Sequence, residues 1–305
     1  MNFWRLVSAS LLAVALAAGT WDDAPRPNPP LTLGGYRVLA ADFHLHEYPF
    51  SGSTLAPWDL VLEARRQGLD AIAITGHNYV LAGLVGRWFG RFADSPIVLA
   101  GEEIHAPGYH LLAVGIHQTI GWRASAAHSI DQVHRQGGVA IAAHPLASSW
   151  PAYSAEAMRK LDGAEVMQPA VFQIPRGAEE LRRFFARGHL TAVGSSDFHG
   201  IGPIGLCRTY VFAREASEQG ILEALRQGHT VVYGNHGDAY GDAALIALAA
   251  QYGRLREREP AAPRGGFLGW LSRICGVAGM LGLTVSEFRG RPRTAPATFT
   301  MSGRR

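Results

Sequence analysis

The chain has 305 residues, 48% of them hydrophobic, and carries a formal net charge of +3. This length and composition suffice for one large α/β domain with extensions, while so small a charge, without a basic motif interleaved with aromatic residues, gives nucleic-acid binding no support. Only two cysteines occur, Cys207 and Cys275. They exclude a disulfide framework and a CxxC zinc site, although export would permit one bond between them, so any metal ion must be held by nitrogen and oxygen.

The first residues have the pattern of an export signal. Arg5 supplies a positive charge, residues 6–18 are apolar apart from two serines, and Ala15-Leu16-Ala17 offers a small-x-small cleavage site. We predict a cleaved signal peptide or a membrane anchor over residues 1–20, because a cytosolic helix would show a polar periodicity that this segment lacks. Residues 21–35 are predicted to form a linker.

Short apolar runs alternate with segments of helical periodicity between residues 36 and 235, which is typical of parallel strands buried on both faces. The runs predicted as strands are residues 38–41, 71–75, 97–100, 110–114, 139–143, 164–167, 191–194, 208–213 and 230–233. The helices predicted between them are residues 57–67, 126–136, 178–187 and 217–227. Seven strand–helix units up to residue 199 predict an α/β fold, a distorted (βα)7 barrel of the TIM type, in which functional side chains follow the C-terminal ends of strands.

The pattern changes beyond residue 235. Residues 243–251 are predicted to be helical, and residues 267–285 are apolar and rich in Gly but interrupted by Arg273. This second segment fits a membrane-associated helix, a helix that covers the barrel, or a poorly ordered tail. We therefore treat residues 236–305 as a C-terminal extension, whose many arginines predict a solvated tail or a weak contact with a membrane surface.

Eight side chains able to bind metal ions lie near the ends of predicted strands. They are His44, His46, His77, Glu103, His110, His144, Asp197 and His199. Because a barrel gathers these strand ends at one rim, we expect the eight to form one cluster for two or three divalent transition-metal ions. His110 alone lies at the start of its strand, so that strand is expected to run against its neighbours or to begin earlier.

Local spacing separates candidate ligands from their neighbours. His44 and His46 are two apart on an extended segment and point to the same side, whereas alternation allows only one of Glu102 and Glu103 to face inward. Asp42 shares the face of His44 and is expected either to orient a ligand histidine or to bind metal itself. The histidines without a strand-end position are assigned to the surface, the core or remote loops: His105, His117, His128, His134, His189, His229 and His236.

The chemistry predicted for such a cluster is hydrolysis. Two divalent ions that share a bridging hydroxide lower the pKa of water towards 7 and stabilise oxyanions in the transition state. Asp197 is the candidate catalytic residue, because a carboxylate there can bind an ion and accept a proton from the attacking water. The sequence has no Gly-x-Ser-x-Gly elbow, Walker loop or dinucleotide fingerprint. Structural roles stay open for Glu103 in an ion pair, for His110 in a core hydrogen bond and for Asp197 as a helix cap.

Five ordered motifs resemble those of the PHP (polymerase and histidinol phosphatase) family. They are Asp42-Phe43-His44-Leu45-His46, similar to DxHxH, Thr75-Gly76-His77-Asn78, similar to TDHN, Gly101-Glu102-Glu103, similar to GxE, Ala143-His144-Pro145, similar to AHP, and Ser196-Asp197-Phe198-His199, similar to SDxH. The resemblance spans roughly residues 36–233. It implies a distorted seven-stranded βα barrel, two or three ions of zinc, manganese or iron, and hydrolysis of phosphoesters.

The resemblance also implies how the ligands divide. One ion would be held by His44, His46, Glu103 and Asp197, a second by Glu103, His110 and His144, and a third by His77, His199 and a residue of the loop after the first motif. The sequence departs from the family at two positions that concern the third ion. Ser51 and its neighbours stand where the family's usual Asp or His is expected, and Gly76 stands for the Asp of TDHN.

Three functions are compatible with these observations. The first is an exported or membrane-anchored metal-dependent phosphoesterase that acts on a small molecule, with membrane contact through the N-terminal or C-terminal apolar segment. The second is hydrolysis of a carbon ester, amide or carbamate, because the same hydroxide can attack a carbonyl and Arg208 is the only nearby candidate for binding a phosphate. The third is a non-catalytic module that keeps its metal as structure, which the departures at Ser51 and Gly76 support.

Overall fold

The computed structural model describes residues 3–21, 29–92, 96–200, 202–234, 237–255 and 267–290. His236 and parts of the predicted C-terminal extension, residues 256–266 and 291–305, lie outside the described residues. Both cysteines in the described part are free, so the disulfide that export would permit is not formed.

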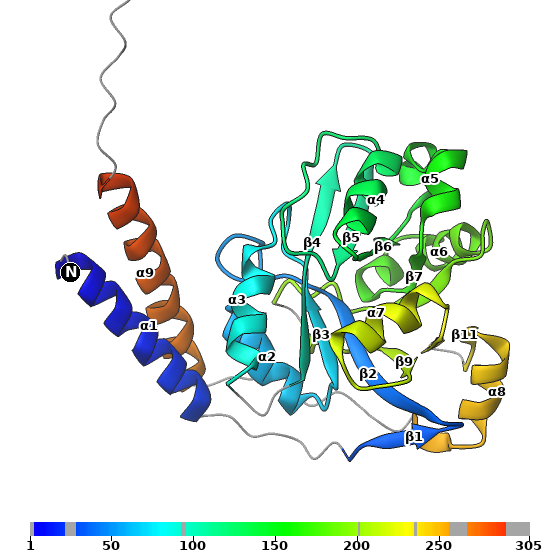
Figure 1. Cartoon of the computed structure of the whole chain (residues 1–305), viewed down its shortest axis with the longest axis horizontal. Coiled ribbons are helices and arrows are strands. Elements are labelled where there is room, and N and C mark those ends of the chain that lie inside the picture. Colours follow the sequence, from blue (N-terminus) through cyan, green and yellow to red (C-terminus); the bar gives the residue numbers. More distant parts are fainter. Residues whose placement is uncertain are drawn as a thin grey trace, which may run out of the picture.

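A mixed sheet of 11 strands forms the centre of the molecule (Figure 1). Its order is β11-β10-β9-β2-β3-β4-β5-β6-β7-β8, and β1 pairs with β2 at the side. The strands are β1 (Leu31–Leu33), β2 (Tyr36–Leu45), β3 (Ala71–Ile74), β4 (Ile97–Ala106), β5 (Tyr109–Val114), β6 (Val139–Ala142), β7 (Gly163–Met167), β8 (Thr191–Gly194), β9 (Thr209–Ala213), β10 (Thr230–Tyr233) and β11 (Ala239–Gly241).

The strands do not all run in one direction, which corrects the expectation of a parallel barrel. β2, β3 and β4 are parallel, as are β6, β7 and β8. β5 is antiparallel to both β4 and β6, and β9 is antiparallel to β2. β4 and β5 are joined by a tight turn with Gly108 at a φ of 100°, and so short a connection can join only antiparallel strands. The expectation that the strand of His110 runs against its neighbours is confirmed.

The sheet curls into a nearly closed barrel, as the sequence predicted. β8 ends the order of the sheet, and threonines of β9 and β10 reach across to it. Thr209 Oγ1 accepts a hydrogen bond from the Gly194 N–H (2.9 Å) and lies 2.8 Å from the Gly194 carbonyl oxygen, while the Thr230 hydroxyl donates to the Ala192 carbonyl (2.7 Å). Side-chain hydroxyls therefore satisfy the backbone of the edge strand across the seam.

Helices cover the outside of this barrel (Figure 1). The α-helices around it are α2 (Pro57–Arg66), α3 (Leu81–Gly90), α4 (Ala126–Arg135), α5 (Ala155–Lys160), α6 (Gly177–Phe185), α7 (Glu218–Arg226) and α8 (Ala243–Ala250). Three 3-10 turns are η1 (Ala147–Ala152), η2 (Pro169–Gln173) and η3 (Gly253–Leu255). Most helices cover the outer face of the sheet, but Ile221 and Leu225 of α7 join the cluster of buried side chains that fills the barrel interior.

An irregularity in β2 decides which side chains enter the barrel. Leu39, Ala41 and Phe43 belong to the interior cluster, whereas Leu45 belongs to the outer cluster between sheet and helices. The register against β3 shifts between Asp42 and Leu45, so the alternation changes phase there. This change turns His44 and His46 inward.

Two further helices lie beside α2 and α3 (Figure 1). They are α1 (Phe3–Trp21) and α9 (Phe267–Gly290). By length and composition α1 could cross a membrane, and its place near the N-terminus is also typical of a signal sequence. α9 extends five residues beyond the helical segment considered from the sequence, residues 267–285.

Candidate metal centre

Seven of the eight predicted metal-binding side chains fall into groups whose ligand atoms all lie within 4.8 Å of one another. The groups are His44, His46 and Asp197, then His44, Glu103 and His144, then His46, His77 and His199, and finally His77, Glu103 and His105. His110 is outside these groups, but its Nδ1 lies 2.9 Å from Glu103 Oε1. The eight side chains therefore meet at one opening of the barrel. His110 reaches it because β5 is antiparallel to its neighbours, so its first residues lie beside their C-terminal ends.

Four ligand atoms form a compact set around His44. Its Nε2 lies 3.0 Å from His46 Nε2, 3.2 Å from Asp197 Oδ1 and 3.6 Å from Glu103 Oε2. His46 Nε2 lies 3.0 Å from Asp197 Oδ1 and 3.6 Å from Glu103 Oε2. At ligand distances of about 2.0 to 2.1 Å, the ligand atoms of a tetrahedral zinc ion lie about 3.3 Å apart. These five distances are close to the spacing of ligand atoms around one transition-metal ion.

Glu103 links this set to a second one. Its Oε2 faces His44 and His46, while its Oε1 lies 2.9 Å from His110 Nδ1 and 3.1 Å from His144 Nε2. A carboxylate whose two oxygens face different groups of imidazoles can bridge two ions. Glu103 is 1% exposed and lies inside β4, which corrects the expectation that this strand ends at Ala100.

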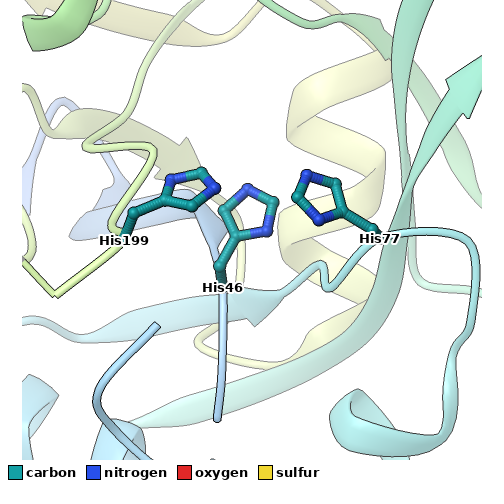
Figure 2. A group of neighbouring side chains, drawn as sticks. All are labelled: His46, His77 and His199. Carbon is teal, nitrogen blue, oxygen red and sulfur yellow. The ribbon is translucent and has the colours of Figure 1, made fainter. Parts of the chain in front are cut away.

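The third set consists of three histidine rings in a row with His46 in the middle (Figure 2). The ring centroid of His46 lies 4.4 Å from that of His77 and 4.0 Å from that of His199. Ser51 Oγ lies 2.7 Å from His46 Nδ1 and 3.2 Å from His77 Nδ1, and it accepts a hydrogen bond from the backbone N–H of His77 (2.8 Å). Where the related motif has an ionisable ligand, this chain has a hydroxyl that holds two rings in place.

The second departure, Gly76, is matched by a nearby carboxylate. A Cβ at Gly76 would lie 2.9 Å from both Cδ and Oε1 of Glu47, so a side chain there would require the Glu47 carboxylate to move. Glu47 is 1% exposed and accepts a hydrogen bond from the Tyr79 hydroxyl. The loss of an acidic residue at position 76 is therefore accompanied by a buried acidic residue that fills the same space.

Strained backbone conformations concentrate at the cluster. Among the described residues other than Gly, positive φ angles occur at Asn78 (57°), His144 (27°), Asp197 (48°) and Arg176 (63°). The first three belong to the sequence motifs. Each such residue costs about 1–3 kcal/mol, and Asn, Asp and His tolerate the left-handed region better than most residues. These backbone conformations direct the side chains of His144 and Asp197 into the opening of the barrel.

Two side chains that the sequence did not single out hold the candidate ligands. Glu165, fully buried in β7, places Oε1 2.9 Å from His44 Nδ1, and its Oε2 accepts a hydrogen bond from the backbone N–H of His144 (2.6 Å). Gln168 Nε2 donates to Asp197 Oδ2 (2.6 Å). In the sequence, the role of Glu165 was indicated by its charge within the apolar run at residues 164–167. Carboxylates behind ligand imidazoles fix the ring orientation and strengthen binding.

Asp42 occupies a different position from the one expected. Its carboxylate accepts hydrogen bonds from the backbone N–H groups of Ser196 (3.1 Å), Gly205 (2.7 Å) and His44 (3.3 Å). Asp42 therefore fastens the loop that carries Asp197, and Glu165 contacts the His44 ring. The phase change in β2 breaks the simple alternation that put Asp42 on the face of His44.

Arg208 is 7% exposed, and its Nε donates to the Gly205 carbonyl (3.0 Å). A guanidinium in this position holds the loop that Asp42 also fastens. A role for Arg208 in binding a substrate stays a prediction.

His105 was assigned away from the site, but it lies beside the cluster. It follows Glu103 by two residues in β4, pairs with His110 across to β5, and shares a group with His77 and Glu103. Its backbone N–H donates to Asn78 Oδ1 (2.9 Å). Its position two residues after Glu103 on the same strand places His105 on the same face. This was not recognised from the sequence, because β4 was expected to end before Glu103.

The pKa values show how the cluster is balanced without ions. Burial alone would lower the pKa of His44, but Asp197, Glu165 and Glu103 together raise it well above its usual value. Burial would raise the pKa of Glu103 and of Asp197, but the neighbouring histidines lower both. Burial lowers the pKa of His46 to about 3, which keeps that ring neutral. Ionised carboxylates and neutral imidazoles are the forms that bind metal ions, and a divalent ion can replace the proton on His44 as the positive charge.

Replacing Glu165 with Gln is expected to weaken metal binding about 10- to 100-fold, because the negative charge behind His44 is lost while its shape remains. Competition with a chromophoric chelator measures the change. The control is Glu63→Gln, which removes a carboxylate that is 2% exposed and pairs with Arg66 in α2. Equal affinities in Glu165→Gln and wild type would contradict the role of Glu165.

Glu102 faces away from the cluster, so that only one of the two neighbouring glutamates points inward, as strand alternation required. It is fully buried, and its Oε1 accepts a hydrogen bond from the Ile120 N–H (2.6 Å). Burial raises the pKa of Glu102 to about 7. Since the folded state binds this proton more tightly than the unfolded state, Glu102 should lower stability progressively as the pH rises from about 4.5 to about 7.

The Glu102→Gln variant should therefore gain stability relative to wild type as the pH rises. The expected difference is close to zero at pH 4 and reaches at most about 3 kcal/mol at pH 8. Urea unfolding of both proteins in chelator measures it, because other titrating groups cancel between them. A difference that does not change with pH would contradict the raised pKa.

Comparison with known proteins agrees with this geometry. Residues 178–230 match the family described as PHP-associated. A two-domain protein from Bacteroides vulgatus that contains a predicted PHP-like metal-dependent phosphoesterase superposes with a TM-score of 0.58 at 22% identity, over 75% of this chain and 74% of that chain. This chain has a PHP-like fold. The fold that the resemblance implied is thereby confirmed, and the nearly closed barrel is the PHP-like architecture.

Other similarities cover smaller parts. An uncharacterized protein, MJ1587, from Methanocaldococcus jannaschii is 26% identical over 139 residues, 42% of this chain and 81% of that protein. An amidohydrolase from Chromobacterium violaceum, solved with bound sulfate and no metal, aligns with a TM-score of 0.46 at 15% identity, over 54% of this chain and 89% of that chain. Within the PHP-like fold, the PHP-associated match runs from α6 through Asp197 and His199 to the start of β10.

Proposed function

We propose that the protein is a metal-dependent phosphoesterase that hydrolyses a small-molecule phosphoester. The observation that carries the proposal is the spacing of the ligand atoms of His44, His46, Glu103 and Asp197, which suits one tetrahedral ion. The description of the Bacteroides vulgatus protein as containing a PHP-like metal-dependent phosphoesterase supports phosphoesters as the substrate class.

We propose that His44, His46, Glu103 and Asp197 hold one ion and that Glu103, His110 and His144 hold a second. A third, weaker position would use His77 and His199, where Ser51 replaces an ionisable ligand. Nitrogen and carboxylate ligands in this mixture suit zinc, manganese or iron. When bound, the ions would activate water for attack and stabilise the negative charge of the transition state.

The chain's own groups have defined parts in this reaction. Glu165 holds the His44 ring and the backbone of His144, and Gln168 holds Oδ2 of Asp197. The Asp197 carboxylate, whose Oδ1 lies beside His44 and His46, is the proposed acceptor of the proton from the attacking water.

A cavity of about 390 Å³ adjoins the second set of ligands. Its lining includes His110, His144, Ser148 and Ser149. This volume is in the range of small-molecule sites, and serine hydroxyls beside the histidines can orient polar oxygens of a substrate. We propose that the leaving group occupies this cavity.

Hydrolysis assays test the proposal directly. Protein loaded with manganese or zinc should hydrolyse an aryl phosphate or a phosphodiester, and a chelator should abolish the activity. Inactivity on a broad panel of phosphoesters would contradict the proposal. Hydrolysis of carboxyl esters without phosphoesters would favour the carbon-ester alternative instead.

A further inference from the structure

The two terminal helices, α1 and α9, form an antiparallel pair. A Cβ at Gly282 would lie 3.3 Å from Cβ of Ser8, and a Cβ at Gly279 would lie 2.8 Å from Cγ of Leu12. Further along, Ser272 Oγ lies 2.7 Å from the Ala15 carbonyl oxygen. As the residue numbers rise along α1, the numbers of the residues that they contact in α9 fall. The first residues of α1 therefore lie beside the last residues of α9 (Figure 1).

Small residues allow this close approach. A Cβ at Gly279 would come within 2.7 Å of the Ser8 carbonyl oxygen, so the two backbones nearly touch. Ser8, Ala15 and Ser272 are buried in the contact. Helices that associate in water bury large apolar side chains, whereas helices that associate in lipid commonly meet through Gly, Ala and Ser.

The large apolar side chains of the pair point outward instead. Those from 44% to 85% exposed are Phe3, Trp4, Leu6, Val14, Trp21, Phe267, Trp270, Ile274, Leu281 and Val285. So large an exposed apolar surface is unfavourable in water and is typical of a surface that contacts another apolar phase.

The length of α1 and the end groups of the pair fit a bilayer, and the shorter apolar part of α9 is Phe267–Leu283. The 19 residues of α1 span about 28 Å, close to the roughly 30 Å of a bilayer's hydrocarbon core. Phe3 and Trp4 lie at one end, and Trp21, Phe267 and Trp270 lie at the other, as in the aromatic belts of membrane proteins. Arg273, about two turns into α9, lies 5.3 Å from the centroid of the Trp270 ring and can reach the near interface.

The barrel packs against the half of the pair that contains Trp21 and Phe267. Trp58 of α2 packs in a cluster with Ala15, and Asp59 Oδ1 lies 3.1 Å from Ser272 Oγ. Trp88 of the neighbouring helix α3 is 56% exposed, and Phe92, in the turn after that helix, is 73% exposed. Aromatic side chains on this side of the barrel can enter the headgroup region when the pair is in the bilayer.

We propose that α1 is retained rather than removed as a signal peptide, and that α1 and α9 together form a two-helix membrane anchor with the barrel at one membrane face. Removal of α1 would uncover the glycine face of α9 and leave the Ser272 hydroxyl without the Ala15 carbonyl to which it donates. The occupant of the exposed apolar surface is the hydrocarbon of a lipid bilayer, and this inference is independent of the metal centre.

Cysteine cross-linking in native membranes tests the pairing. In a Cys275→Ser background, the double variant Ser8→Cys/Gly282→Cys has a Cβ separation close to the roughly 3.8 Å of disulfides and should form an intramolecular bond on oxidation. The matched control, Ser10→Cys/Gly282→Cys, places the first cysteine on the exposed side of α1 and should not cross-link. Equal cross-linking in both pairs, none in either, or a cross-linked dimer would overturn the proposed pair.

Wild-type protein tests retention and insertion without any substitution. After washing the membranes with alkaline carbonate, the protein should remain in the pellet, and its intact mass should include residues 3–21. Release by carbonate would overturn insertion, and a mass without α1 would overturn retention. Gly279→Leu should weaken the contact between α1 and α9. Gly269→Leu should not, because a Cβ at Gly269 meets nothing within 4 Å.

Discussion

Replacing Glu103 with Gln is expected to remove more than one metal ion per chain and to lower hydrolysis by about 10³-fold or more. The reason is that Glu103 faces both sets of ligands: its Oε2 lies 3.6 Å from His44 Nε2, and its Oε1 lies 2.9 Å from His110 Nδ1. An amide keeps the shape but loses the charge and the ability to bridge two ions. Elemental analysis together with steady-state kinetics measures both effects.

The neighbouring substitution supplies the control. Glu102→Gln changes an equally buried carboxylate on the opposite face of β4 and should leave the metal content and the activity unchanged. If Glu103→Gln kept the full metal content, or if both variants lost it equally, a bridging role for Glu103 would be wrong.

Asp197→Asn is expected to lower kcat by about 10³-fold while leaving the fold intact. Asp197 Oδ1 lies 3.0 Å from His46 Nε2, and Oδ2 receives a hydrogen bond from Gln168, so the substitution removes a ligand charge and the proposed proton acceptor together. The activity of protein saturated with metal separates the two, because saturation restores occupancy but cannot restore the proton acceptor.

The surface variant Asp131→Asn serves as the comparison for Asp197→Asn. It removes the ion pair with Lys160 far from the cluster and should leave kcat at the wild-type value. Full recovery of kcat in Asp197→Asn at saturating metal would show that Asp197 only binds metal.

Much of the architecture could be predicted because it depends on local patterns. The strand at Thr230–Tyr233 agrees with the predicted run, and helix α4 differs from its prediction by one residue. Alternation allowed only one of Glu102 and Glu103 to face inward, and the resemblance to GxE selected Glu103. The unusual place of His110 offered a reversed strand as one of two alternatives, and that alternative is confirmed. These conclusions rest on side-chain periodicity, which the backbone imposes residue by residue.

The missed features depend on contacts between distant segments. Helix α3, with three glycines and no clear polar face, carries little periodicity of its own and is stabilised by packing on the sheet. Glu165 appeared as a residue of a buried strand, and its role is visible only when His44 lies across from it, 121 residues away in sequence. The phase change in β2 is likewise visible only in its register against β3.

The departures at Ser51 and Gly76 show the same distinction. In sequence, both are losses of an expected ligand. In the structure, the Ser51 hydroxyl holds the rings of His46 and His77, and the carboxylate of Glu47 fills the space beside Gly76. Compensation of this kind involves residues that are separated in the chain, so it is invisible until the fold brings them together.

If one opening of this barrel holds a cluster of transition-metal ions, the metal content of the purified protein will show it. Protein purified without chelators should contain at least two zinc, manganese or iron ions per chain by elemental analysis, with anomalous scattering beside Glu103. Less than one ion per chain, after incubation with each of these metals and removal of the excess, would contradict the claim.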